Sequence, residues 1–359
     1  MIPNHQKENP MSEQKEMRAA YAETLISLVE EGFDIVVLEA DLMRATGTGA
    51  FAKKYPERAV NVGVAEANLI GVASGLSAGN KIPFAATFAC FASRRAYDQF
   101  FLSANYAGLN VKLVGTDPGV TAAFNGGTHM PFEDLALMRA IPRLTIAEPS
   151  DPVSAAALVR LAASTYGCFY FRLPRKPAPF LYRADESFSI GSAKVLRKGG
   201  DVTLVALGAV MVGEALKAAD ILAGENIQAT VIDALWVAPL DEAAILAHAG
   251  CGRIVTCENH RVTGGLGSAV AELIAEKAPG VRLARIGVAS NLFGEVGTQD
   301  WLAEHFHLTA PYIAQAAREL CAGRPAADRL SAVQQPDTRP EMTRSAQPQP
   351  SGAHGASGA

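Results

Sequence analysis

The sequence predicts an α/β protein with two domains, each built around a mainly parallel sheet. Short apolar runs alternate with segments whose apolar residues recur at helical spacing, and glycine and proline mark the connections. A continuous apolar run such as 34–38 is typical of a strand buried on both faces, as parallel strands are. The chain has 359 residues, enough for about two domains at roughly 150 residues each.

The first half of the chain alternates between helices and strands. Apolar residues from Met17 to Val29 recur at helical spacing and stop at Gly32, which is typical of a helix C-terminus. Further helices are predicted near 66–76, 96–106, 132–140 and 152–163, and strands at 34–38, 110–114, 144–146 and 168–171. This alternation with short connections predicts a parallel sheet covered by helices.

The second half repeats the pattern on a smaller scale after a proline-rich segment at 174–189. Strands are predicted at 202–206, 229–232, 253–256 and 281–286, and helices near 213–222 and 268–276. The resulting organisation is a flexible leader at 1–15, a first domain at 16–180, a linker at 181–195, a second domain at 196–322 and a tail at 323–359. Disorder is predicted for the tail, because its Pro, Gln, Ser, Gly and Ala cannot bury enough apolar surface.

The charge and the distribution of apolar residues argue against several classes of function. The formal net charge is -4 and Lys and Arg form no run, so nucleic-acid binding has no electrostatic support. Residues 1–18 lack the apolar stretch of a secretory signal, and no apolar run approaches the ~20 residues that span a bilayer. The five cysteines are scattered and never form Cys-x-x-Cys, which predicts reduced thiols in a cytoplasmic protein.

Short motifs of two other kinds of site, an esterase elbow and a dinucleotide-binding loop, occur in the wrong context. Residues 75–79 fit the Gly-x-Ser-x-Gly elbow of esterases, but Ser77 closes a helical stretch instead of following a strand. Residues 47–52 imitate a dinucleotide-binding loop, yet 41–46 separate them from the preceding strand. The glycines at 264–267 are better placed, and we interpret them as a close turn between a strand and a helix.

The most informative segment is 61–68, where Glu66 follows a strand and begins an apolar helix. For an isolated glutamate, the helix dipole would be a sufficient explanation. Here the run GVAEANLIGVASGLSAGNKIPFAATFACF is followed in order by RAYDQ, LNVKLVG, GGTHMPFEDLALMRAIP, AEPSD and YFRLPRKP, and later by CENHRVTGGLGSAVAE. Over about 16–322 these motifs resemble the transketolase family.

The resemblance implies a thiamine-diphosphate-dependent enzyme, with a parallel-sheet pyrimidine-binding domain followed by a smaller α/β C-terminal domain. It implies that Glu66 hydrogen-bonds the aminopyrimidine of the cofactor and promotes loss of the thiazolium C2 proton, which is general acid–base assistance. Val62 and Val64 are expected to give this carboxyl an apolar surrounding. Further implied cofactor contacts are Phe88 and Phe91 stacked on the pyrimidine, Arg94 where the family often has a tyrosine, Asp41 and Leu42.

The resemblance also implies substrate contacts. His129, on a long glycine-rich loop, matches the histidine that contacts substrate hydroxyls and can relay a proton. Asn125 and Asp117 stand where the family has an acidic residue and a histidine that helps to hold the sugar phosphate. Because a carboxylate would repel phosphate, we expect pentose phosphates to be poor substrates. Arg172 matches the phosphate-binding arginine, and a guanidinium binds phosphate or sulfonate equally well.

Other charged residues near these motifs have simpler interpretations. Arg175 and Lys176 are interpreted as solvated linker charges, although they could assist in binding the substrate. His260 is interpreted as structural, because the family's second domain serves mainly in assembly.

One part of a thiamine-diphosphate site is missing from the sequence, namely a Gly-Asp-Gly segment with an Asn some 25–30 residues later. The resemblance therefore implies an N-terminal partner subunit that supplies the diphosphate and Mg²⁺ ligands, with no metal ligand on this chain, and an α2β2 heterotetramer is expected. We interpret the chain as one subunit of a split transketolase that transfers a two-carbon ketol unit from an anionic ketose to an aldose.

Two alternatives stay open at this point. One is another enzyme of the same superfamily, a deoxyxylulose-phosphate-synthase-like or 2-oxo acid dehydrogenase β-type subunit, which consumption of pyruvate by the reconstituted pair of chains would support. The other is a non-catalytic assembly subunit, against which the joint presence of Glu66, Phe88, Phe91 and His129 speaks.

Overall fold

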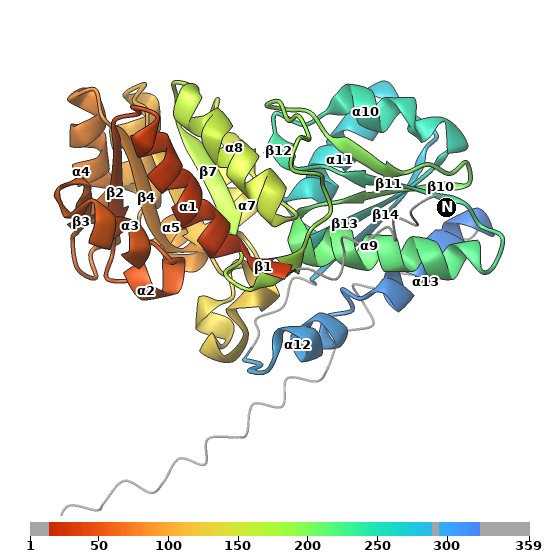
Figure 1. Cartoon of the computed structure of the whole chain (residues 1–359). Helices are drawn as coiled ribbons and strands as arrows, with labels where there is room; N and C mark the ends of the chain where they lie inside the picture. The colour runs from red at the N-terminus through yellow and green to blue at the C-terminus, as the bar shows by residue number, and fades with distance from the viewer. Residues whose placement is uncertain (1–13, 289–293, 324–359) are drawn as a thin grey trace, which may run out of the picture. The chain divides into compact units, whose positions relative to one another are not determined.

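Two sheets organise the computed structural model, which describes residues 14–288 and 294–323 (Figure 1). The first has seven strands in the order β12-β6-β7-β5-β4-β2-β3, and the second has five in the order β14-β13-β10-β11-β9. Neighbouring strands are parallel except for β12 with β6 and β11 with β9. The predicted fold class, α/β with mainly parallel sheets, is therefore confirmed.

The first sheet contains β2 (Ile35–Glu39), β3 (Ala59–Asn61), β4 (Ile82–Phe88), β5 (Lys112–Thr116), β6 (Thr145–Ala147), β7 (Phe169–Leu173) and β12 (Trp236–Ala238). The helices of this half are α1 (Met17–Glu30), α2 (Met43–Thr46), α3 (Gly49–Lys54), α4 (Glu66–Ala78), α5 (Ala89–Arg94), α6 (Tyr97–Gln99), α7 (Asp134–Arg139) and α8 (Pro152–Ser164). A π-helical segment, Phe100–Tyr106, continues from α6.

Side chains alternate between the two faces of the first sheet, and helices cover both. Along β2, Ile35 and Val37 pack in one cluster with residues of α1 and α8, whereas Val36 and Leu38 pack in another with residues of α4. Figure 1 shows α1 and α8 crossing the near face of the strands. All residues of β2, β5 and β7 are buried, as expected for central strands of a parallel sheet.

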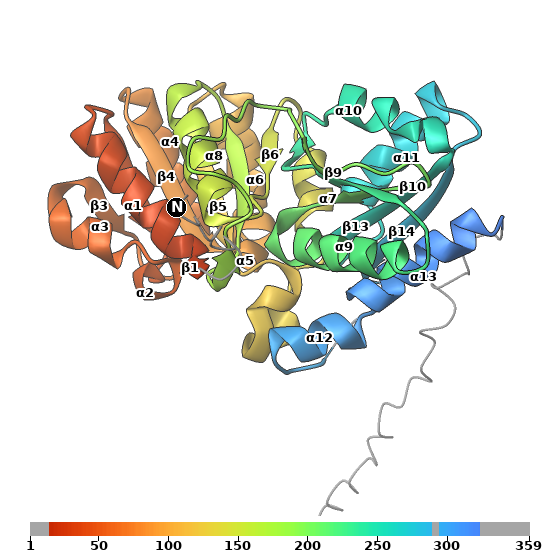
Figure 2. The same ribbon diagram turned by 45° about the vertical axis from the view of Figure 1, so that its right-hand side comes forward.

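The second sheet contains β9 (Lys194–Arg197), β10 (Val202–Ala206), β11 (Ala229–Asp233), β13 (Arg253–Arg261) and β14 (Arg282–Val288). Its helices are α9 (Gly208–Ala223), α10 (Glu242–Ala247), α11 (Leu266–Lys277), α12 (Gln299–His305) and α13 (Ala310–Cys321). Helices α9 and α13 lie side by side on one face (Figure 2), where Met211 and Ile313 belong to the same buried cluster. Residues of α11 pack in the cluster on the other face.

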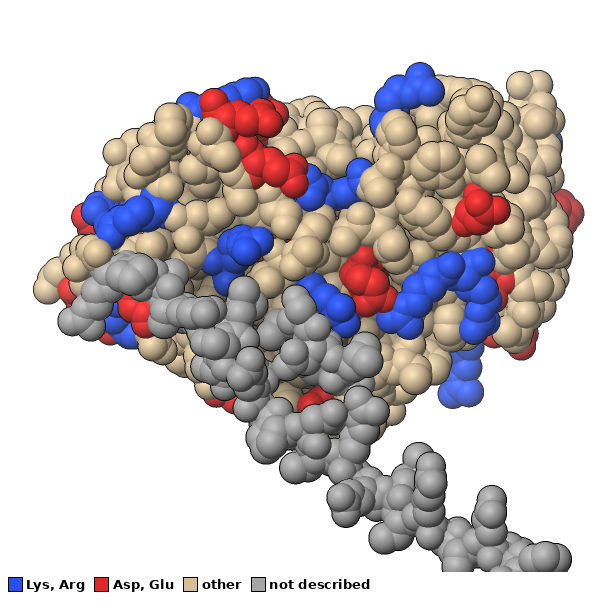
Figure 3. All heavy atoms as spheres, turned by 180° about the vertical axis from the view of Figure 1, so that it is seen from behind, with Lys and Arg blue, Asp and Glu red and all other residues tan. Residues whose placement is uncertain are grey.

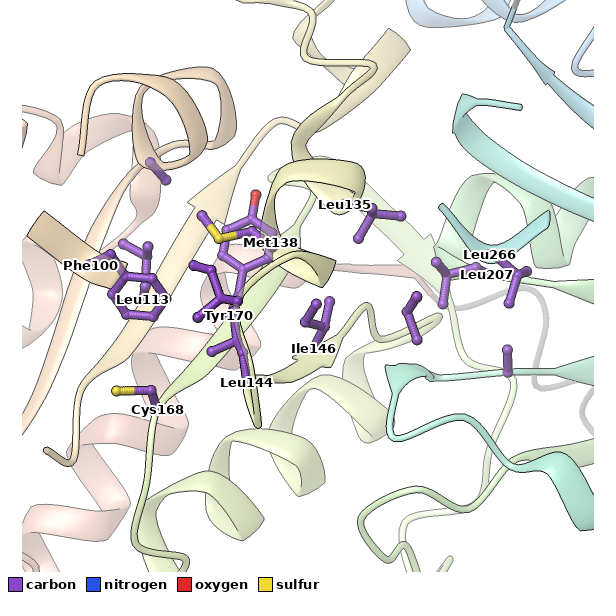
Figure 4. Packing of buried hydrophobic residues seen from close by; sticks show 14 of the residues in the cluster. Phe100, Leu113, Leu135, Met138, Leu144, Ile146, Cys168, Tyr170, Leu207 and Leu266 are labelled. Atoms are coloured by element: carbon purple, nitrogen blue, oxygen red, sulfur yellow. The ribbon is translucent and has the colours of Figure 1, made fainter. Parts of the chain in front are cut away.

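The two halves of the chain share a sheet and a core. Strand β12 follows β11 in the chain but pairs with β6, so Trp236 lies opposite Ala147 and is wholly buried. Figure 4 shows Leu207 and Leu266 of the second half in the same hydrophobic cluster as Ile146 and Leu135 of the first. The second domain is therefore joined to the first by a strand as well as by side-chain packing.

The structure adds elements that the sequence pattern did not predict. No element was predicted for 82–94, where strand β4 ends at Phe88 and helix α5 begins at Ala89. Helix α13 was not predicted; it buries one apolar face, which includes Ile313 and Leu320, in the same cluster as residues of α9. Strand β1 (Gln14–Glu16) pairs with β8 (Pro177–Pro179), which places part of the proline-rich segment in a two-stranded sheet.

Some predictions concern residues that the structure does not describe. The leader prediction falls on residues 1–13 except for the start of β1, and the tail prediction falls on residues 324–359 except for Gly323. Among the described residues, no helix is both long enough and apolar enough to cross a membrane.

Arg172, predicted to bind the substrate, is instead wholly buried on β7 in a network of charges. Its Nε and Nη2 atoms donate to the carboxylate of Asp134 at 2.8 and 3.2 Å, Nη1 donates to Glu148 at 2.5 Å, and Nη2 also donates to the carbonyl of Asn259 at 2.9 Å. Burial opposes the charge of Arg172, but Asp134 and Glu148 outweigh it and raise the pKa of the guanidinium. With its donors engaged in the protein interior, Arg172 cannot contact a substrate, so this part of the prediction is wrong.

The same network joins the two domains and holds His260. The imidazole is fully buried beside Asp134, Nε2 accepts the backbone N–H of Ala136 at 3.4 Å, and Nδ1 donates to the carbonyl of Arg261 at 2.8 Å. Burial lowers the pKa of His260 to about 4, so the ring is neutral at physiological pH and can accept at Nε2. The structural interpretation of His260 is therefore confirmed.

Ser77 has a structural contact as well. It lies inside α4, and its Oγ accepts the buried backbone N–H of Asn110 at 2.7 Å, just before β5. The residue does not occupy a turn between a strand and a helix, so the structure agrees that the esterase-like motif is accidental.

Replacing Arg172 with methionine is expected to destabilise the protein by about 3–5 kcal/mol, because Asp134 and Glu148 would remain buried without their cation. Chemical denaturation measures this change. Arg183→Met, which breaks the exposed pair with Asp185, is the control and should leave the free energy of unfolding nearly unchanged. A stable Arg172→Met protein that had lost only its affinity for anionic substrates would restore the substrate-binding role.

Ser77→Ala should cost about 1–3 kcal/mol, because the buried N–H of Asn110 would lose its acceptor. Enzymatic turnover should be unchanged. Ser74→Ala is the matched control in the same helix, since within the described residues the buried Ser74 hydroxyl has no hydrogen-bond partner. Equal stability losses in the two variants, measured by thermal melts, would contradict the assigned role of Ser77.

Candidate functional site

The predicted cofactor residues lie at the carboxyl edge of the first sheet. Strands β2 and β4 are neighbours, but β2 is followed along the chain by β3 on one side and β4 by β5 on the other. Such a switch in direction opens a crevice at the carboxyl ends of parallel strands, where ligands bind in open α/β sheets. Asp41 follows β2, Glu66 begins the helix after β3, and Phe88 ends β4.

Glu66 is the first residue of α4 and is 1% exposed. Arg95, just after α5, donates from Nη1 to both carboxylate oxygens at 3.1 and 3.0 Å. Each carboxylate oxygen has two lone pairs, so this contact fixes the orientation of the carboxylate and leaves acceptor positions for a ligand. The expected apolar surrounding is only partly present, because Val62 packs against the core but Val64 is 71% exposed.

Two phenylalanines connect Glu66 and Arg95 to the glycine-rich loop. The guanidinium of Arg95 lies 4.4 Å from the ring centroid of Phe91, and the rings of Phe91 and Phe88 are 6.1 Å apart. The imidazole of His129 stands edge-on to both rings, at 5.3 Å from Phe91 and 6.1 Å from Phe88. The structure thus brings together the four residues on which the predicted site depends. They are Glu66, Phe88, Phe91 and His129, and Arg95 lies among them.

Short polar contacts hold the His129 loop in place. The hydroxyl of Thr128 and Nδ1 of His129 are 2.9 Å apart. Arg94 donates from Nη1 to the carbonyl of Thr128 at 3.2 Å and forms an ion pair with Glu133. Arg94 was predicted to contact the cofactor, and its contacts within this chain position the loop next to His129.

Asp41 and Leu42 lie at the end of β2, on the same edge. Asp41 has a left-handed backbone (φ 64°), and its N–H donates to the side-chain oxygen of Asn61 at 3.0 Å. The same oxygen accepts the N–H of Gly63 at 3.1 Å, and Nδ2 of Asn61 donates to the carboxylate of Asp41 at 3.2 Å. Asn61 therefore ties the chain after β2 to the segment that leads into Glu66.

Asp117 follows β5 and lies beside Arg175, which was predicted to be a solvated linker charge that could assist in binding the substrate. Its carboxylate is 1% exposed, and Oδ2 is 2.8 Å from Nη2 of Arg175. The guanidinium of Arg175 also lies 5.7 Å from the ring centroid of Phe88. Arg175, three residues after the buried Arg172, is therefore the arginine that borders the aromatic pair, whereas Asn125 is exposed on the loop before His129.

The second domain holds the start of this loop through Asn259. The side-chain oxygen of Asn259 accepts the N–H of Val120 at 2.9 Å, and Nδ2 donates to the carbonyl of Pro118 at 3.0 Å. Gly119 has φ +54° and passes so close that an added Cβ would meet the Asn259 oxygen at 2.2 Å. A glycine is needed there, because a side chain would separate the loop from the second domain.

Three residues of the site were missed from the sequence. Arg95 begins the RAYDQ motif and Asn259 lies in CENH, so both were visible but had no assigned role. Arg175 was interpreted as a linker charge that could assist in binding the substrate, because nothing in a linear pattern shows which of two nearby arginines is buried. On the face that Figure 3 shows, Lys and Arg are interspersed with Asp and Glu and neither sign gathers into a large field.

Comparisons with known families agree with this organisation. The pyrimidine-binding domain of transketolase matches residues 13–179, and the transketolase C-terminal domain matches residues 191–313. Together these two families cover most of the chain.

Similar proteins include subunits of divided transketolases. The 6-deoxy-6-sulfo-D-fructose transketolase subunit SqwH of Clostridium sp. (strain MSTE9) is 49% identical over 85% of this chain and 94% of its own length. The putative transketolase C-terminal section of Methanocaldococcus jannaschii is 40% identical over 85% of this chain and 96% of its own length. A solved structure of a split-gene transketolase, described as an inactive beta4 tetramer, is 42% identical with a TM-score of 0.79, covering 86% of this chain and 98% of that one. This chain belongs to the transketolase family, as the C-terminal subunit of a split enzyme whose two chains together transfer ketol units.

Proposed function

We propose that this subunit supplies the pyrimidine-facing half of a thiamine diphosphate site, and that an N-terminal partner chain supplies the diphosphate and Mg²⁺ ligands. The observation that supports this most directly is the continuous set of contacts from Glu66 through Arg95 and Phe91 to His129. This set fits an aminopyrimidine, a flat aromatic ring with a basic nitrogen. A buried carboxylate can hold the proton of the ring nitrogen, and two half-buried phenyl rings can pack against the ring face.

The residues of this chain have distinct roles in the proposal. Glu66 exchanges a proton with the pyrimidine nitrogen, and the first turn of α4 favours its negative charge. Arg95 keeps the carboxylate in one orientation. His129 has Nδ1 engaged by Thr128, which leaves Nε2 for a hydroxyl of the substrate. When bound, thiamine diphosphate would supply the nucleophilic carbon that the ketol transfer needs.

We propose a ketose with a sulfonate terminus as the donor. Support comes from the 49% identical relative, which is named a 6-deoxy-6-sulfo-D-fructose transketolase subunit. Arg175 is the cation that suits such a terminus, because it is half-buried and borders Phe88. The role predicted for Arg172 thus passes to Arg175 in the proposal.

The complete enzyme is proposed to be an α2β2 heterotetramer. The cofactor would then bind across the boundary between the two kinds of chain, so neither chain alone would hold it fully.

The cavity of about 440 Å³ between α1 and α8 is lined by none of the cofactor residues named above. The proposal also places the reaction in the cytoplasm, on the grounds that the five cysteines are free thiols.

Isolated subunit should bind thiamine diphosphate weakly and show no turnover, because the diphosphate and Mg²⁺ ligands are assigned to the partner. Isothermal titration of the subunit with cofactor and Mg²⁺, before and after addition of the N-terminal chain, measures this. Tight, Mg²⁺-dependent binding to this chain by itself would contradict the proposed division of the site.

Glu66→Gln should lower turnover of the assembled enzyme by roughly 10²–10⁴-fold, because glutamine keeps the shape but cannot exchange the proton. Cofactor affinity should fall less, and the free energy of unfolding should change by about 1 kcal/mol or less, since Arg95 is half-exposed. Proton exchange at C2 of the bound cofactor, followed by NMR, isolates the step.

Glu57→Gln is the control for this experiment, because Glu57 is an exposed carboxylate outside the site and its replacement should leave exchange unchanged. If C2 proton exchange in the Glu66→Gln enzyme is as fast as in the wild type, Glu66 has no catalytic role and only places a negative charge at the start of α4.

A further inference from the structure

Asp117 is a buried carboxylate at the edge of the site, and its backbone has a conformation that few residue types adopt. It has φ +53°, in the left-handed region that asparagine and aspartate tolerate better than most side chains. Its backbone N–H donates to the carbonyl of Leu173 at 3.2 Å, so the residue is fixed to the end of β7, the strand that leads to Arg175. The proposed donor specificity needs a cationic pocket, and the inference that follows rests on that proposal.

The charged groups that face Asp117 come from two segments. Arg175 and Lys176 follow β7, and Arg18 belongs to α1. Arg18 is already neutralised, because its Nε and Nη2 atoms donate to Glu16 at 2.9 and 3.1 Å. The remaining charges, two positive from Arg175 and Lys176 and one negative from Asp117, sum to one positive charge.

This net positive charge lies near His129, the residue proposed to contact the hydroxyls of the substrate. The guanidinium of Arg175 lies 5.7 Å from the centroid of the Phe88 ring, and that ring is 6.1 Å from the imidazole of His129. A donor that contacts His129 with its hydroxyls could therefore reach Arg175 with its far terminus. That terminus would meet a guanidinium whose Nη2 atom is 2.8 Å from Oδ2 of Asp117.

We propose that Asp117, paired with Arg175, selects donors by the charge of their terminus, accepting a singly charged sulfonate and disfavouring a doubly charged phosphate. A sulfonate carries one negative charge at any physiological pH and matches the single net positive charge of the group. A phosphate monoester carries about -1.5 to -2 at pH 7, with a second pKa near 6. Its extra charge meets the carboxylate, and a guanidinium alone would not distinguish the two anions in this way.

The selection should depend on pH. Burial raises the pKa of Asp117 to about 6, against the attraction of Arg175, Arg18 and Lys176. The carboxylate is therefore ionised at pH 8, and its charge is lost as the pH falls through 6. Protonation leaves two positive charges at the terminus, while the phosphate itself becomes mostly singly charged over the same range. Both changes weaken the discrimination at low pH.

The experiment uses the reconstituted two-chain enzyme with three donors and one aldose acceptor. The donors are 6-deoxy-6-sulfo-D-fructose, D-fructose 6-phosphate and uncharged L-erythrulose, and kcat/KM is measured for each between pH 5.5 and 8. In the wild type, the ratio of phosphate to sulfonate activity should rise as the pH falls. Asp117→Asn should raise this ratio by roughly 10–100-fold at pH 8, mainly through KM for the phosphate. In that variant the ratio should stay level or fall at low pH, because a doubly charged terminus is then favoured.

Asp185→Asn, which removes an exposed carboxylate paired with Arg183, is the control and should leave all three donors unaffected. An unchanged ratio in Asp117→Asn, with L-erythrulose still used, would overturn the inference and leave the ketol transfer intact. If Asp117→Asn fails to fold, the wild-type pH profile decides, since a ratio that is flat or falls toward low pH contradicts selection by Asp117. Loss of transfer from every donor in the wild type would instead refute the proposed function.

Discussion

The buried guanidinium of Arg172 is the contact on which the arrangement of the two domains depends. It binds Asp134 at the start of α7, Glu148 after β6 and the carbonyl of Asn259 in the second domain. Charges in the interior are costly unless each is paired and hydrogen-bonded, so these partners fix one relative position of the two sheets. Asn259 then holds the loop from Pro118 to Val120, and this loop leads on to His129. A buried contact that takes no part in the proposed chemistry thus positions a residue that does.

The site itself follows from the order of the strands. Because parallel strands end at the same edge, Phe88, Asp117 and the segment before Glu66 come close together although they are far apart in the chain. Loops at such an edge can change without disturbing the sheet, which is the usual basis for new specificity on an old scaffold. The pair of Asp117 and Arg175 is such a local feature, whereas Glu66 begins a helix that packs into the core.

Much of this organisation could be predicted from the sequence, for physical reasons that differ between residues. A continuous apolar run identified β2, because a strand buried on both faces favours apolar residues. Strands β5 and β10 were predicted from the alternation of strands and helices, and they bury Lys112 and Thr203 beside their apolar side chains. Motif order identified Glu66, Phe88, Phe91 and His129 as a group. Arg172 could not be placed in this way, because burial depends on the partner side chains that the fold brings in. The role of Arg95 was hidden for the same reason, since its partner Glu66 is 29 positions away.

Strand β12 limits how the two domains of this protein can be exchanged during evolution. The first sheet is completed by a strand from the second half, and Trp236 fills the core between that sheet and its helices. The two domains are therefore not interchangeable modules, since either one separated from the other would lose a sheet partner and expose a hydrophobic surface. Recombination that exchanged one domain for a distant relative's would have to preserve the pairing of β12 with β6 and the fit around Trp236. We therefore expect the two domains to evolve together as one unit, although each is built around its own sheet.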